Sequence, residues 1–293
     1  MKFFLKQIAL YGFFIFILLN LVALGSFWSL RKSTFYKPSF AVNQDIANLD
    51  YIVLGSSTGL TTLNTVQIDS LTNWKGLNLS MDDTGLPSHY LMLKHFLVSG
   101  GHINKCVLAI TPWDLANSNP SLGNNDHRFL PFIFNKEVKN HFRDLPTSGA
   151  SPLFFSAFIP LYGLGYYNTE LFYPSLIAFA KPEYRNRFDE KGNYVYPNLG
   201  KSLSVNAIKQ SEYSFNNPYL EKIKLLCKEH KIKLILYQSP MLNQHQVSLK
   251  SMDLINHSAL LAQDTNLFYD EIHVNKKGRK IATKSFVDAI LKR

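Results

Sequence analysis

A serine at the end of a short apolar strand is the first residue that could perform chemistry. Residues 51–60 read YIVLGSSTGL, in which positions 51–54 have the side chains of a buried strand and Gly55, Ser56 and Ser57 break that pattern. In open α/β sheets, ligands bind outside the carboxyl ends of the strands, so Ser57 can meet a substrate there. A serine hydroxyl becomes nucleophilic only when a base removes its proton, so this interpretation requires a histidine and an orienting acid.

The segment Asp270-Glu271-Ile272-His273 supplies both groups. Aspartate and histidine three residues apart in a turn can lie side by side, so that the carboxylate fixes the imidazole tautomer while the other ring nitrogen faces a serine. Ser57, Asp270 and His273 are therefore the candidate catalytic residues. The alternative is that Gly-Ser-Ser is an ordinary turn, that Asp270 caps a helix and that His273 is a hydrogen-bonded turn residue.

No histidine spacing indicates a metal site, and we expect neither a metal nor a cofactor. The two cysteines, Cys106 and Cys227, lie in apolar runs and predict buried side chains without a disulfide framework.

The elements that must position these residues alternate between strand and helix. Strands are predicted at 51–54, 77–79, 106–110 and 231–237, and helices at 89–98, from Pro218 onward and from Asn275 onward. This alternation predicts a parallel sheet of the doubly wound type. At 293 residues the chain is long enough for one main domain with an insertion.

The amino-terminal segment has a different composition. Residues 8–30 contain no charge, and 23 residues in a helix span about 34 Å, enough to cross a bilayer. We expect a membrane anchor at residues 1–32 and a linker at 33–49. The alternative is a cleaved signal peptide with a small-residue site at Ala23-Leu24-Gly25, but the apolar run continues past that site. We expect a single-pass protein of the cell membrane with its larger domain on the extracytoplasmic side.

The net charge of +10 does not by itself indicate nucleic-acid binding, because no basic and aromatic recognition motif of the usual kinds is present. A surface that works near anionic lipid or an anionic polymer explains the charge equally well. We therefore expect the membrane as a partner and no nucleic acid. Seven of the cations lie in the last eighteen residues, where they are also consistent with the solvated face of a terminal helix.

The alternation of strands and helices is interrupted at about 115–214, which we interpret as an aromatic-rich insertion in a domain that covers 50–293. Residues 151–169 (SPLFFSAFIPLYGLGYYNT) contain no charge, but their prolines and glycines disfavour a regular spanning helix. Two interpretations remain open, a lid or membrane-surface segment and an aromatic subdomain with its own core.

The order of these motifs resembles that of the SGNH (GDSL-like) hydrolase superfamily. The resemblance covers roughly 50–116 and 218–293, and it rests on G-x-S after the first strand, an asparagine-containing segment after the second and D-x-x-H before a terminal helix. It implies a flavodoxin-like three-layer α/β sandwich, with Ser57 as nucleophile, Asp270 as orienting acid and His273 as base.

The resemblance also implies an oxyanion hole, and there the sequence departs from the family. The backbone N–H of Ser57 is the first expected donor. Gly85 is the best match to the glycine that the family uses in its oxyanion hole, but it lies later in the sequence than that glycine does. Trp113 occupies the position of the family's asparagine donor. Asn78 and Asn117 are therefore further candidates. Trp113 is also consistent with a pocket wall or a core position. Ser56 replaces the common aspartate, as in variants among membrane-anchored cell-envelope members.

The anchored layout resembles that of proteins of alginate O-acetylation and lipoteichoic-acid D-alanylation, which work beside a polytopic membrane acyltransferase. The expected function is acyl transfer through an acyl-serine intermediate that adds acyl groups to, or removes them from, an anionic or neutral cell-envelope glycopolymer. Alternatives are a plain lipase or esterase and a non-catalytic accessory protein of a membrane acyltransferase or polysaccharide system.

Overall fold

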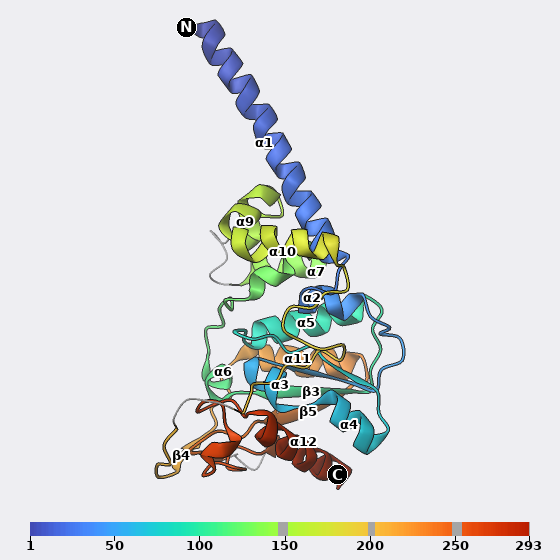
Figure 1. Cartoon of the computed structure of the whole chain (residues 1–293), viewed down its shortest axis with the longest axis vertical. Helices are drawn as coiled ribbons and strands as arrows, with labels where there is room; N and C mark the ends of the chain where they lie inside the picture. Colours follow the sequence, from blue (N-terminus) through green and yellow to red (C-terminus); the bar gives the residue numbers. More distant parts are fainter. Residues whose placement is uncertain (146–151, 199–202, 248–253, 293) are drawn as a thin grey trace. The chain divides into compact units, whose positions relative to one another are not determined.

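The computed structural model describes residues 1–145, 152–198, 203–247 and 254–292 (Figure 1). The chain forms two compact units, which are described separately below. One comprises residues 44–125 and 187–293, and the other comprises residues 1–43 and 126–186. Within the expected insertion, residues 146–151 and 199–202 lie outside the described part of the chain, as does Arg293 among the carboxyl-terminal cations.

The first unit is built on a five-stranded parallel sheet with the strand order β2-β1-β3-β5-β7. Its strands are β1 (Tyr51–Gly55), β2 (Gly76–Asn78), β3 (Lys105–Ile110), β5 (Lys233–Gln238) and β7 (Leu254–Asn256). The β1 strand is an interior strand, because it pairs with β2 on one side and with β3 on the other. The sheet confirms the predicted α/β class, and β7 is a strand that the sequence analysis did not predict.

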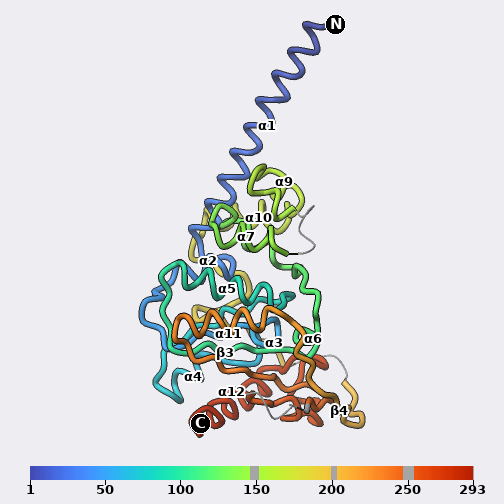
Figure 2. Tube along the Cα trace, turned by 180° about the vertical axis from the view of Figure 1, so that it is seen from behind, coloured from blue at the N-terminus to red at the C-terminus, as the bar shows by residue number. Residues whose placement is uncertain are grey.

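Helices cover both faces of this sheet, which gives a three-layer sandwich of the flavodoxin-like type (Figures 1 and 2). One face is covered by α3 (Ser57–Thr62), α4 (Thr65–Thr72) and α12 (Lys276–Leu291). The other face is covered by α5 (Leu86–Val98) and α11 (Pro218–Glu229). The fold therefore matches the predicted class, with Asn217 and Asn275 capping α11 and α12.

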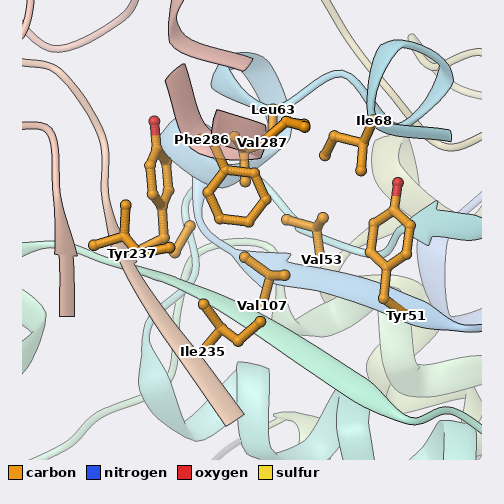
Figure 3. Packing of buried hydrophobic residues seen from close by; sticks show 11 residues of the cluster. Tyr51, Val53, Leu63, Ile68, Val107, Ile235, Tyr237, Phe286 and Val287 are labelled. Carbon is orange, nitrogen blue, oxygen red and sulfur yellow. The ribbon is translucent and has the colours of Figure 1, made fainter. Parts of the chain in front are cut away.

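Alternate residues of the strands form the core between the sheet and α12, because side chains in a strand point to opposite faces in turn. Figure 3 shows Val53 of β1, Val107 of β3 and Ile235 of β5 beneath Phe286 of α12. Phe286 is fully buried and lies edge-on to Tyr237, with the ring centroids 5.2 Å apart. This packing fixes α12, and with it the segment that precedes α12, on the sheet.

Shorter elements complete this unit. They are α6 (Pro112–Ala116), the 3-10 helix η3 (Thr265–Leu267), and the strands β4 (Lys209–Glu212) and β6 (Gln244–Val247), which pair in parallel. Residues 187–196, in the segment expected to belong to the insertion, are part of this unit and hydrogen-bond to β2 and α4. Asn78 N donates to Lys191 O, and Asn193 Oδ1 accepts from Thr65 N.

Among the described residues of the second unit, all the regular secondary structure is helical. This unit contains α1 (Lys2–Arg31), α2 (Lys37–Val42), the 3-10 helix η1 (Asp126–Phe132), α7 (Lys136–Asp144), α8 (Pro152–Phe155), α9 (Pro160–Tyr166) and α10 (Asn168–Ala180). Within the described part of the chain, α1 is the helix that is long and apolar enough to cross a membrane. The segment expected to be a linker contains α2, whose residues 37–41 are buried.

Candidate functional site

The turn from β1 to α3 places Ser57 at the carboxyl end of the sheet. β1 ends at Gly55, Ser56 adopts an extended conformation, and Ser57 is the first residue of α3. A β-carbon on Gly55 would lie 2.9 Å from the β-carbon of Ala109, and one on Gly59 would lie 2.8 Å from Ser80 Oγ and 2.9 Å from the same β-carbon of Ala109. Both glycines are therefore needed for α3 to lie this close to β3, and this approach leaves Ser57 half-buried.

The far end of α3 is held by two partners. Arg279 Nη2 and Thr283 Oγ1 of α12 donate to the backbone oxygens of Leu63 and Thr62, respectively. From the opposite side, Asn78 Nδ2 donates to the backbone oxygens of Gly59, Leu60 and Leu63 at 3.1–3.4 Å. These contacts fix α3 relative to α12.

The turn that carries Asp270 and His273 is fixed at the start of α12. Asn275 is fully buried, its Oδ1 accepts from the N–H groups of Lys277 and Gly278, and its Nδ2 donates to Phe268 O. A β-carbon on Gly278 would lie 2.1 Å from Leu267 O, so glycine is required where α12 meets the preceding turn. The cap and the close approach together join the turn of residues 268–274 to the start of α12.

Ser57, His273 and Asp270 form a continuous chain of hydrogen bonds. His273 Nε2 lies 2.7 Å from Ser57 Oγ, and His273 Nδ1 lies 2.8 Å from Asp270 Oδ2 and 2.9 Å from Oδ1. The His273 ring is nearly buried, whereas about a third of the Asp270 side chain is exposed. The three side chains that the sequence analysis selected are therefore brought together in the geometry of a nucleophile, a base and an orienting acid.

Asp270 is arranged to remain a carboxylate. Burial acts to raise its pKa, but hydrogen bonds from the His273 ring and from the backbone N–H groups of Ile272 and His273 act in the opposite direction. The net result is a pKa below the ordinary value, because these donors stabilise the charged form. The carboxylate can therefore stabilise an imidazolium that forms at His273 during a reaction.

Tyr196 is a site residue that the sequence analysis missed. Its ring stacks on the Tyr269 ring, with the centroids 4.2 Å apart and the planes inclined at 8°. The centroid of the Tyr196 ring also lies 5.1 Å from that of the His273 ring. The backbone of Tyr196 forms an isolated parallel bridge with Asn275. No local pattern in the sequence marks this residue, because its position depends on a strand-like contact between segments about eighty residues apart.

The four candidates for an oxyanion hole occupy different positions. Asn78 is fully buried, and its amide Nδ2 is used in hydrogen bonds to the backbone of α3. Trp113, in α6, is half-exposed. Gly85 precedes α5 and Asn117 follows α6, and both line the same pocket.

This pocket of about 160 Å³ lies between the loops that follow β2 and β3. Because these strands flank β1 in a parallel sheet, their loops lie at the same edge as Ser57. Thr84–Pro87, Asp114, Asn117, Pro120–Gly123 and Asn217 line it. Burial raises the pKa of Asp114 to about 6, although a hydrogen bond from Thr111 acts to lower it.

Comparisons with known proteins do not assign this chain to a family. No family model matches it, and no curated protein matches it significantly.

Gly59→Ala should displace α3 and reduce the reactivity of Ser57, because the new methyl group would meet Ser80 Oγ and Ala109 at less than 3 Å. We expect at least a tenfold slower reaction with a serine-directed fluorophosphonate, equivalent to a loss of about 1.4 kcal/mol of transition-state stabilisation. Gly165→Ala is the matched control, because that glycine lies in α9 with open space around it. Equal rates for the two variants would contradict the role given to Gly59.

Asp114→Asn should stabilise the protein at pH 7.5 but not at pH 4. Because the fold raises the pKa of Asp114 from about 4 to about 6, its carboxyl contributes most favourably when protonated, and stability is lost as the pH rises through this interval. Removing the charge should increase the free energy of unfolding at pH 7.5 by roughly 2 kcal/mol.

The measurement is denaturant unfolding at both pH values, with Asp288→Asn, an exposed position on α12, as the control. A gain of the same size at pH 4 would show that burial of the charge is not the cause.

Proposed function

We propose that this protein is a serine acyl-transfer enzyme in which Ser57 is the nucleophile. The observation that carries the proposal is the 2.7 Å contact between Ser57 Oγ and His273 Nε2, with the other ring nitrogen held by Asp270. His273 takes the proton from Ser57 as Oγ forms a bond to the acyl carbon of an ester. Its Nε2–H then protonates the departing alkoxide, which leaves an acyl-serine and a neutral imidazole.

The second half of the reaction uses the same base. His273 removes a proton from water or from an acceptor hydroxyl, whose oxygen forms a bond to the acyl carbon, and the Ser57–acyl bond breaks as the proton returns to Ser57 Oγ. Water as acceptor gives hydrolysis, and a sugar hydroxyl gives O-acyl transfer. The triad is suited to both outcomes, so the choice between them depends on what binds beside Ser57.

Negative charge on the acyl oxygen requires donors close to Ser57. Ser57 is the first residue of α3, and the first N–H groups of a helix have no partner within that helix. The Ser57 N–H is therefore the first donor of the proposed oxyanion hole. Gly85 N–H and Asn117 Nδ2 are the further candidates because their residues line the pocket at this edge of the sheet.

The resemblance to SGNH hydrolases agrees with this assignment, since the parallel sheet, the serine after β1 and the Asp–His pair before the last helix stand in the order of that superfamily. We further propose that α1 is an uncleaved single-pass anchor that places the α/β unit outside the cell membrane. The proposed substrate is a cell-envelope glycopolymer, and the proposed partner is a polytopic membrane acyltransferase.

The second candidate function is that of a non-catalytic accessory protein of such a system. The observation that favours it is Trp113, which stands where the family has an asparagine donor and is half-exposed. A protein of this kind would keep the fold and the triad geometry but would not stabilise an oxyanion.

Labelling with a fluorophosphonate separates these functions. We expect the purified full chain in detergent to be labelled at Ser57, and we expect Ser57→Ala and His273→Ala to reduce the rate of labelling at least a hundredfold, because the reagent requires a deprotonated serine. Ser56→Ala and His102→Ala are the matched controls, since Ser56 adjoins the nucleophile and His102 is exposed elsewhere. Wild-type protein that is not labelled would exclude the enzyme and support the accessory function.

A transferase should prefer a sugar hydroxyl to water. With an acetyl ester as donor, added oligosaccharide should increase consumption of the donor, and acetylated oligosaccharide should exceed free acetate in a manner that depends on Ser57. Mass spectrometry of the sugar and titration of the released acid measure the two products. Free acetate as the sole product would assign the protein to the esterases.

A further inference from the structure

The helices α8, α9 and α10 present an apolar surface that the proposed chemistry does not use. Glu170 is the single charged residue from Pro152 to Ala180. The large apolar side chains exposed on this surface, called the aromatic surface below, are Phe155, Phe158, Ile159, Tyr162, Tyr166, Phe172, Tyr173, Leu176 and Phe179. Large apolar side chains that are exposed together in this way mark a site of contact with a membrane or with another protein.

The helices that carry the aromatic surface pack against α1, whose exterior is also apolar. Both α9 and α10 pack on the carboxyl-terminal half of α1, as Figures 1 and 2 show. Ala23, Phe27 and Leu30 of α1 are buried, whereas Leu24 and Trp28 remain exposed. The same segment of α1 therefore has one side against the other helices of its unit and another side that is exposed and apolar.

A polar contact fixes the level at which α9 meets α1. Asn20 is the single side-chain amide between Ile8 and Leu30, and its Oδ1 accepts a hydrogen bond of 3.1 Å from the backbone N–H of Leu161. Leu161 lies in the first turn of α9, where backbone N–H groups lack a partner within the helix. The hydrocarbon core of a membrane contains no water that could accept a hydrogen bond, so a backbone N–H group placed there requires an acceptor from the protein.

A second contact lies nearer the end of α1, where Ser29 Oγ donates to Ser175 O at 2.7 Å. Small and polar side chains that connect closely packed helices are typical of helix contacts within membranes.

The position of Asn20 along α1 determines the depth of this contact. At 1.5 Å per residue, Asn20 lies about 21 Å from Lys6 and about 17 Å from Arg31. A hydrocarbon core of about 30 Å that begins at Lys6 would place Asn20 about 9 Å inside the far boundary. A hydrocarbon core that ends at Arg31 would place Asn20 about 17 Å inside the boundary at Arg31. Either placement puts the start of α9 below the membrane surface.

Cations lie on α7, at the end of α1 and directly after α10, outside residues 152–180. They are Arg31, Lys136, Lys139, Arg143 and Lys181. Lys139 Nζ lies 4.9 Å from the centre of the Phe158 ring, so a cation and an edge of the aromatic surface are adjacent. Such a pair is suited to the level of the lipid headgroups, where aromatic rings and lysines are both enriched.

We propose that α8–α10 are embedded in the membrane leaflet at the carboxyl end of α1, with lipid acyl chains covering the aromatic surface. This proposal rests on the part of the proposed function in which α1 is a membrane anchor. The membrane-bound part of the protein is then a helical unit rather than a single helix. Inside the hydrocarbon, Asn20 accepts the hydrogen bond of the Leu161 N–H at the start of α9.

Environment-sensitive labels at single cysteines test the proposal. The native Cys106 and Cys227 are buried, so a thiol reagent should reach only an introduced cysteine. Tyr162→Cys and Tyr166→Cys place an NBD fluorophore on one face of α9, Phe14→Cys places it on the middle of α1, and Leu71→Cys places it on an exposed position of α4. The full chain is reconstituted in vesicles of phosphatidylcholine and phosphatidylglycerol.

We expect NBD at positions 14, 162 and 166 to emit at shorter wavelength and to be quenched by nitroxide-labelled acyl chains but not by aqueous iodide. NBD at position 71 should be quenched by iodide alone. Iodide quenching at 162 and 166 with lipid quenching at 14 would overturn the embedding and leave the anchor intact. Iodide quenching at 14 would instead overturn the anchor. Protection of 162 and 166 from both quenchers would mean that protein covers the surface, which also overturns the proposal.

The role of Asn20 has its own test. Asn20→Leu removes the acceptor for Leu161 N–H, so we expect NBD at position 162 to become at least threefold more accessible to iodide. Asn20→Gln should restore protection because it keeps an amide oxygen, and Leu19→Ala is the neighbouring control. Unchanged protection in Asn20→Leu would overturn the assigned role.

Discussion

The hydrogen bond between Ser57 and His273 joins residues 216 positions apart, and the rest of the α/β unit determines whether it can form. Ser57 begins α3, and His273 lies just before α12. Both helices cover the same face of the sheet, and their mutual hydrogen bonds at Thr62, Leu63 and Thr283 fix one relative to the other. The distance between hydroxyl and imidazole is therefore set by helix packing rather than by the side chains themselves.

The packing of these helices depends on a few small residues. Gly55 and Gly59 allow α3 to approach Ala109, and Gly278 allows α12 to approach Leu267 O. A larger side chain at any of these positions would move the backbone that carries a triad member. The fold and the proposed chemistry therefore share the same requirement for close backbone contact.

The proximity of Ser57, Asp270 and His273 could be predicted from the sequence because their motifs are local. G-S-S after an apolar strand and D-E-I-H before a capped helix each occupy a few consecutive residues, and the parallel topology brings the two together. The fold class followed from the alternation of apolar strands and helices for the same reason. The short strand β7 was not predicted, and it follows residues 248–253, which lie outside the described part of the chain.

Features that depend on contacts between distant segments could not be predicted. Tyr196 reaches His273 through a bridge to Asn275, and the Asn78 amide is occupied by the end of α3. For the aromatic segment, the sequence is consistent both with a lid or membrane-surface element and with a separate subdomain. Its prolines and glycines correctly disfavoured one long helix, and the structure shows shorter helices there, but periodicity alone could not reveal that they pack on α1.

The contact between Asn20 and Leu161 also bears on what loss of the amino-terminal segment would do to the fold. A leader peptidase that cut at Ala23-Leu24-Gly25 would remove Asn20 together with the buried Ala23, and the severed peptide would leave part of the packing surface of α9 and α10 uncovered. The amino-terminal helix is therefore also a structural part of the helical unit, because it supplies packing surface for α9 and α10 and an acceptor for the Leu161 N–H.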